Sequence, residues 1–225
     1  MKRLPIIAAL ATLVDHLALG GALGSGALMH APVALIALTL PSLFLASLGA
    51  RLVDRYGVQR AMRLVKLLEL AGIAICASAA FGFPPGAYLG LVVLGAKGAM
   101  FAPIKYSSAP RLAGRGDELL RASMLVATAT AVSMIAGIIG GLQLQQAFGY
   151  GVLGGLLATL AVVGWLFVPT AQAPAIVEPT VDVMSVRTLG LSLLGIGWFW
   201  ALAALLVGLL VPYGMVTLGG GSWTS

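Results

Sequence analysis

Seven apolar stretches, each of about 20 residues, account for most of this chain and limit what it can fold into. Such a stretch, folded as an α-helix, is long enough to cross the hydrocarbon core of a bilayer. With 60% hydrophobic and only 9% charged residues, the chain has too little polar surface for a water-soluble domain. We therefore expect an all-α membrane protein. The stretches cover residues 4–28, 32–50, 62–82, 87–106, 120–145, 150–168 and 188–213.

The segment 169–187 separates the first six stretches from the seventh. It contains three prolines and several charged residues, a composition typical of an extended linker. We therefore predict a six-helix N-terminal bundle over 1–168, a Pro-containing cytoplasmic linker over 169–187, and a seventh transmembrane helix within 188–225. A lone seventh helix would be the start of an unfinished second bundle. We therefore expect a truncated architecture, either a fragment or a shortened gene product.

The basic residues gather at alternate connections between the apolar stretches. The connections after the second and fourth stretches are basic, whereas those after the first, third and fifth contain no Lys or Arg. Basic loops stay in the cytoplasm, so we predict a multi-pass protein with a cytoplasmic N-terminus. This pattern explains the net charge of +6 without a nucleic-acid partner. The basic residues at these two connections are Arg51, Arg55, Arg60, Arg63, Lys66, Lys105, Arg111, Arg115 and Arg121.

The connection after the second stretch carries a short motif built around Leu52, Asp54, Arg55 and Gly57. It resembles the Gly-x-Leu-x-Asp-Arg-x-Gly loop of the major facilitator superfamily, with alanine in place of the first glycine. An acid beside a helix end can accept hydrogen bonds from a neighbouring helix terminus, and a glycine permits a tight turn. The resemblance implies that Asp54, Arg55 and Gly57 form a conformational latch loop. The alternative is a solvated loop with an incidental Asp–Arg pair.

Two charged residues lie deep inside predicted helices. Asp15 lies about 11 residues, or roughly 16 Å, into the first stretch, near the middle of the bilayer core. Lys97 lies about 10 residues into the fourth stretch, which runs the other way, so it reaches a similar depth. Because a lone charge in lipid is costly, we predict that Asp15 and Lys97 form an ion pair. The pair would either line a substrate pathway or only hold the bundle together.

Three further polar residues have simpler interpretations. His16, beside Asp15, could relay protons, but a lone histidine is more often a packing residue. Lys66 and Glu69 stand three residues apart near the cytoplasmic end of the third stretch. We expect them to form a local pair whose lysine snorkels towards the membrane surface.

Glycines are frequent in the first and fifth stretches. Gly137, Gly140 and Gly141 partly resemble the glycine-rich antiporter motif of the same superfamily, but the proline of that motif is missing. This absence disfavours a drug/proton antiporter. We predict that these glycines, together with Gly20, Gly21 and Gly24, are sites of close helix packing.

The fourth stretch carries a narrower resemblance. Its Pro103-x-Lys105-Tyr106 element resembles the fourth-helix signature of bacterial lysophospholipid transporters. These proteins also carry a Gly-Asp-Asn element in helix one, of which only Asp15 survives here, and Ser123 replaces an asparagine usual at the entry to helix five. The resemblance covers the seven predicted helices. It implies a secondary transporter of lysophosphatidylethanolamine-like lysophospholipid in the bacterial inner membrane, working by alternating access.

The same resemblance places Asp15 and Lys105 in a polar substrate pathway, which Lys97 would join through its predicted pairing with Asp15. It also implies an acyltransferase partner that re-acylates the imported lipid. The expected partners are thus the lipid bilayer, the lysophospholipid substrate and this enzyme.

Two other functions remain open for the chain. One is an efflux permease for amphiphiles or drugs, and the other is a non-transporting membrane module that only anchors or dimerises. An intramembrane enzyme is disfavoured, since the sequence shows no metal-ligand cluster and no nucleophile–base pair. Cys76 is the single cysteine, so no intramolecular disulfide or multi-cysteine metal site can form. We therefore expect no cofactor and no metal.

Overall fold

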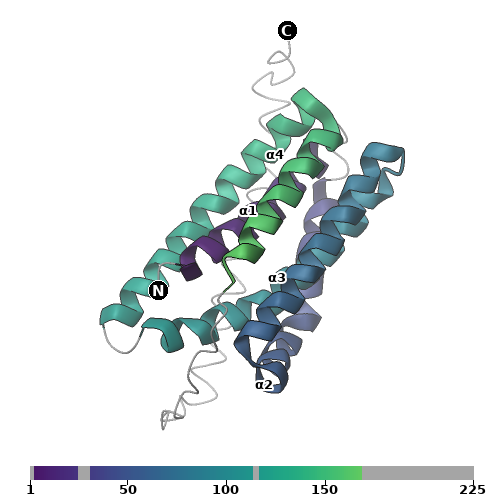
Figure 1. The fold of residues 1–225 in the computed structure, drawn as a ribbon. Coiled ribbons are helices and arrows are strands. Elements are labelled where there is room, and N and C mark those ends of the chain that lie inside the picture. The colour runs from purple at the N-terminus through teal and green to yellow at the C-terminus, as the bar shows by residue number, and fades with distance from the viewer. Residues whose placement is uncertain (1–2, 25–30, 114–116, 169–225) are drawn as a thin grey trace. The chain divides into compact units, whose positions relative to one another are not determined.

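The computed structural model describes residues 3–24, 31–113 and 117–168, and these residues are helical apart from Gly57, 82–84, Gly149 and 167–168. They belong to the first of two compact units, Met1–Ala175 and Ile176–Ser225. The predicted linker 169–187 and seventh helix 188–213 lie outside the described residues. The elements, labelled in Figure 1, are α1 (Arg3–Gly24), α2 (Ala31–Ala77), the short 3-10 helix η2 (Ser78–Phe81), α3 (Pro85–Ala113) and α4 (Asp117–Leu166).

Four of the described segments are long and apolar enough to cross a membrane. The all-α fold and the membrane character predicted from the apolar stretches are therefore confirmed at this level. Proline at the first position of α3 fits its start, because the missing N–H of Pro85 would have no partner within the helix. The four segments are Leu4–Gly24, Ser47–Phe81, Pro85–Lys105 and Leu120–Leu166.

Helix α2 is interrupted at Gly57, whose φ of 75° and ψ of 162° are not helical. A positive φ is open to glycine at little cost, which explains the residue at this point. The break divides α2 into a first arm, 31–56, and a second arm, 58–77. The predicted stretches 32–50 and 62–82 fall largely within these arms. The prediction of a loop between them is wrong, because helical structure continues up to Gly57 from both sides.

The order of contacts with α3 shows that the chain reverses direction at Gly57. Residues with higher numbers in the first arm contact residues with higher numbers in α3, so this arm runs parallel to α3. Residues with higher numbers in the second arm contact residues with lower numbers in α3, so this arm runs antiparallel to α3. The first-arm contacts are Leu38 with Gly95 and Gly49 with Met100. The second-arm contacts are Gly72 with Leu94 and Cys76 with Gly90.

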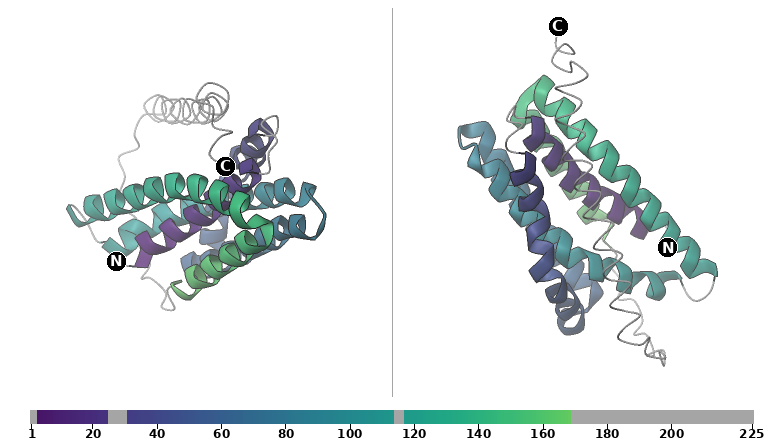
Figure 2. Two further views of the ribbon diagram at one scale, coloured as in Figure 1. Left: turned by 90° about the horizontal axis from the view of Figure 1, so that it is seen from above. Right: turned by 180° about the vertical axis from the view of Figure 1, so that it is seen from behind.

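Helix α4 is broken in the same way at Gly149, with φ 74° and ψ −178°, into arms 117–148 and 150–166. Figure 1 shows the second arm, in green, returning beside the first, and Figure 2 shows α1 alongside both arms. The contacts with α1 agree with this reversal. Residues with higher numbers in α1 contact residues with higher numbers in the first arm of α4, but residues with lower numbers in the second arm. They are His16 with Gly137, Gly24 with Gln145, Gly21 with Leu153 and Leu10 with Gly164.

Small residues bring α1 and the first arm of α4 together. Gly137 and Gly141 are one helical turn apart, and both face the backbone of α1 at Leu17. A Cβ atom at Gly141 would collide with the Leu17 carbonyl, whereas one at Gly140 would reach only 3.4 Å from the Leu17 side chain. From the other side, Gly20 faces the backbone of Ile138. The two helices therefore pack backbone to backbone.

Candidate functional site

Buried charges lie where two apolar clusters of the bundle meet. One cluster contains Ala11, Val65 and Met100, and the other contains Val14, Ile73 and Leu94. The chain passes from one cluster to the other on α1, on the second arm of α2 and on α3. Between or beside these apolar residues, each of the three elements places at least one charged side chain in the core. These side chains are Asp15 on α1, Lys66 and Glu69 on α2, and Lys97 on α3.

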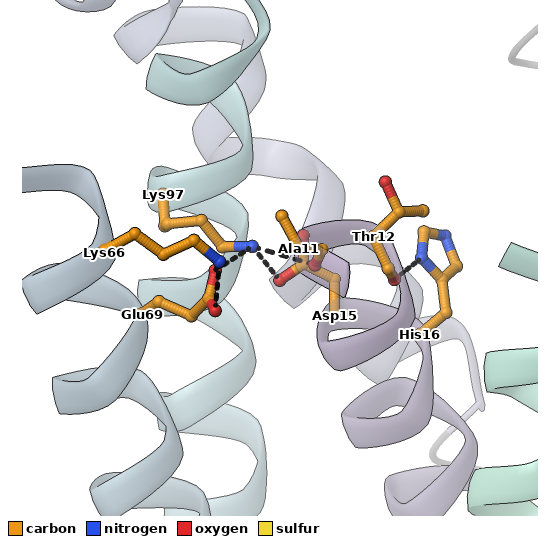
Figure 3. Close-up of polar contacts among 7 residues, drawn as sticks. All are labelled: Ala11, Thr12, Asp15, His16, Lys66, Glu69 and Lys97. Atoms are coloured by element: carbon orange, nitrogen blue, oxygen red, sulfur yellow. Dashed lines mark hydrogen bonds and ion pairs between the residues drawn. The ribbon is translucent and has the colours of Figure 1, made fainter. Parts of the chain in front are cut away.

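Lys97 lies at the centre of these buried charged side chains (Figure 3). Its Nζ atom lies 2.6 Å from Asp15 Oδ1 and 3.0 Å from Glu69 Oε2. It also donates a hydrogen bond to the backbone carbonyl of Ala11, at 3.1 Å. The two carboxylates and the carbonyl offset the cost of burying the ammonium charge. Lys97 thereby ties α3 to both α1 and α2.

Glu69 extends the contacts to a second lysine. Lys66 Nζ donates to both of its carboxylate oxygens, at 2.7 Å to Oε1 and 3.0 Å to Oε2. The result is a continuous series, Asp15–Lys97–Glu69–Lys66, which we call the charge network. It contains two carboxylates and two ammonium groups and is therefore neutral as a whole. Neutrality and mutual contact offset the high cost of removing each charge from water.

The four side chains of the charge network differ in exposure. Those of Lys97 and Glu69 are 1% and 0% exposed, whereas that of Asp15 is 12% exposed. Asp15 Oδ1 is itself buried and has no hydrogen-bond partner of ordinary geometry, so the ion pair with Lys97 is its main polar contact. Its other oxygen, Oδ2, lies 3.6 Å from where a Cβ atom of Gly98 would stand. Asp15 is thus the least enclosed member of the charge network.

The expected contact between Asp15 and Lys97 is present, but one expectation about their surroundings is wrong. Lys66 does not snorkel, because it is 1% exposed. The prediction started the third helix at residue 62, which put Lys66 at its end. The second arm of α2 begins at 58, so Lys66 lies about 12 Å along it. The contact of Glu69 with Lys97 was also missed, although an acid and a base three residues apart in an apolar helix were a signal for it.

His16 and Lys105 lie outside the charge network. His16 Nδ1 is 2.8 Å from the Thr12 carbonyl of its own helix, a hydrogen bond that fits the packing role expected for it. Lys105 is buried, at 7% exposure, and lies eight residues beyond Lys97, about 12 Å along α3. The structure thus places two of the three predicted pathway residues in contact and the third farther along the same helix.

The predicted latch residues surround the break in α2. Asp54 and Arg55 are exposed, and the Arg55 guanidinium stands 5.4 Å from the centre of the Tyr56 ring, a cation–π contact. Within the described part of the chain, Asp54 forms no ion pair. Gly57 forms the turn itself. The latch function remains a prediction.

The charges of the network are paired with one another inside the bundle. Residues 3–24, 31–113 and 117–168 contain no group of three or more His, Cys, Asp or Glu side chains that could hold a metal ion. No protein-family model, no curated protein and no solved structure matches this chain.

Proposed function

We propose that this chain belongs to a secondary transporter that moves lysophospholipid, of the lysophosphatidylethanolamine kind, across the bacterial inner membrane by alternating access. The observation that carries the proposal is the charge network buried where α1, α2 and α3 meet. Charged residues inside membrane helices are costly, and they usually mark a substrate or ion pathway. The Pro103-x-Lys105-Tyr106 element and the motif around Gly57 support the same assignment.

The chemistry of such a substrate suits the charge network. A zwitterionic headgroup carries a phosphate and an ammonium, and the charge network holds partners of both signs. A headgroup that replaces one internal pair leaves the total charge of the site unchanged, so it avoids the cost of an unpaired buried charge. The acyl chain requires apolar walls, which these helices supply in excess.

The proposed architecture is a six-helix bundle of the major facilitator type with its N-terminus in the cytoplasm. The chain reversals at Gly57 and Gly149 support it, because they turn α2 and α4 into pairs of antiparallel arms. A full pathway in this architecture lies between two such bundles that rock about a central site, and two copies of this chain would supply them. An acyltransferase on the cytoplasmic side is the proposed partner.

The test is uptake of labelled lysophosphatidylethanolamine by cells that lack a lysophospholipid transporter of their own. Cells expressing the chain, with membrane insertion verified, are compared with cells carrying an empty vector. We expect faster uptake, which unlabelled lysophosphatidylethanolamine suppresses and a detergent of the same chain length does not. Equal suppression by both competitors would favour a general amphiphile permease. No uptake by the inserted chain would leave a non-transporting module.

A further inference from the structure

The two carboxylates of the charge network are held very differently. Both oxygens of Glu69 contact a lysine, and the residue is fully buried. Asp15 contacts only Lys97 within the network, and part of its side chain is exposed. Glu69 is therefore held by more charged contacts than Asp15.

Lys97 does not depend on Asp15 for its burial. If Asp15 withdraws, Lys97 still has Glu69 Oε2 at 3.0 Å and the Ala11 carbonyl at 3.1 Å. If Glu69 is lost, Lys97 keeps Asp15, but Lys66 loses both of its hydrogen bonds to a carboxylate. The charge network therefore tolerates the opening of its Asp15 end better than the loss of Glu69.

We propose that Glu69 is a positioning residue: it holds the charged Lys97 in place while Asp15 releases it during the transport cycle. The α1–α3 ion pair can then open while the α2–α3 ion pair stays closed. The inference deepens the proposed function and rests on it for the meaning of the cycle. The release of Asp15, however, can be measured without any substrate.

The first test compares two carboxylates in the unmodified chain. A hydrophobic carbodiimide reacts with carboxyl groups in membranes that are free of a tight ion pair, and mass spectrometry locates the modified residues. We expect Asp15 to react at least about tenfold faster than Glu69, as the difference in their contacts implies. Glu69 reacting as fast as Asp15 would overturn the proposal.

The second test removes the alternative partner of Lys97 and keeps the buried charge neutral. The double variant Glu69→Gln/Lys66→Met leaves one carboxylate, Asp15, for one ammonium, Lys97. Asp15 must then hold Lys97 permanently, so its reaction with carbodiimide should slow about tenfold, the size of a typical coupling between contacting residues. The exposed Asp117, modified in the same sample, is the internal control. An unchanged rate at Asp15 would contradict the proposal.

Uptake by the same double variant separates a positioning role from a purely structural one. We expect wild-type melting behaviour and a half-saturating substrate concentration close to wild type, but a maximal rate lowered about tenfold, because release of Asp15 becomes slow. A wild-type maximal rate would contradict the proposal. If the wild-type chain itself transports nothing, the proposed function fails, whereas the labelling experiments still decide the role of Glu69.

Discussion

Lys97 has two carboxylate partners, and this changes what the loss of either one does. The ion pair predicted from the sequence gives Lys97 a single partner, Asp15, whose removal would leave the ammonium unpaired. In the structure, Glu69 and the Ala11 carbonyl also contact the ammonium. At the scale of single residues, Glu69 contacts two lysines and Asp15 contacts one, so we expect Glu69 to matter more for stability.

Replacement of Glu69 should therefore destabilise the chain more than replacement of Asp15. Breaking a buried pair from one side costs roughly 3 kcal/mol or more, and we expect that loss for Glu69→Gln, which strands Lys66. For Asp15→Asn we expect about 1 kcal/mol, since Lys97 keeps a charged partner. Thermal unfolding in detergent measures the difference. A larger loss for Asp15→Asn would show that Glu69 is not the main support of the charge network.

Gly57 permits a second prediction at this scale. Its φ of 75° is open to glycine, and any other residue there is strained. We expect Gly57→Ala to cost about 1–2 kcal/mol in unfolding measurements, although a Cβ atom at this position would meet no neighbour within 4 Å. Gly155→Ala is the matched control, because Gly155 also has open space and lies in a regular helical arm. If Gly57→Ala and Gly155→Ala lower the free energy of unfolding equally, a side chain at position 57 causes no backbone strain.

At the scale of elements, the sequence predicted most of the helices and missed how they connect. Long apolar runs were sufficient to place them, because a segment in lipid must satisfy its backbone internally as a helix. The Arg-rich region after residue 50 was expected to form a loop, since charge clusters and a glycine are typical of one. In the structure those arginines extend the helical arms on either side of Gly57. Composition does not reveal where a helix stops when its polar end lies outside the membrane.

Only part of the charge network could be predicted, because the prediction placed the ends of the helices incorrectly. Asp15 and Lys97 are isolated charges in apolar runs, so depth alone indicated their pairing. Lys66 and Glu69 lie closer to the basic connection, and the start of their helix decides whether they are at the surface or in the core. That start depends on the break at Gly57, which only the folded chain shows.

The contact between α1 and α4 is the element-scale feature that substitutions can test most clearly. A Cβ atom at Gly141 would collide with the backbone of α1, which cannot move aside as a side chain can. We expect Gly141→Ala to cost about 2 kcal/mol, the size of an overpacking effect, and Gly155→Ala to have little effect. Thermal unfolding of the two variants measures this. A neutral Gly141→Ala would mean that α1 and α4 do not pack as closely as described.

At the scale of the whole molecule, the basic connections predict which ends of the helices lie in the cytoplasm. In a Cys76→Ser background, a single cysteine at exposed Arg60 should be protected in intact cells from a membrane-impermeant maleimide. A cysteine at exposed Phe83, in the connection before α3, should react. We expect the opposite labelling in inverted vesicles, as alternating basic loops require. Labelling of Arg60→Cys from outside intact cells would mean that the chain has the opposite orientation to the predicted one.

The central claim is that the charge network lies on the path of a transported lysophospholipid. The most direct measurement is the initial uptake rate of labelled lysophosphatidylethanolamine by the wild-type chain, by Asp15→Asn and by the control Asp117→Asn. All three proteins are compared at equal amounts in the membrane. We predict uptake by the wild type and the control, and a loss of about tenfold or more in Asp15→Asn, while that variant remains folded. Uptake by folded Asp15→Asn at the wild-type rate would contradict the claim.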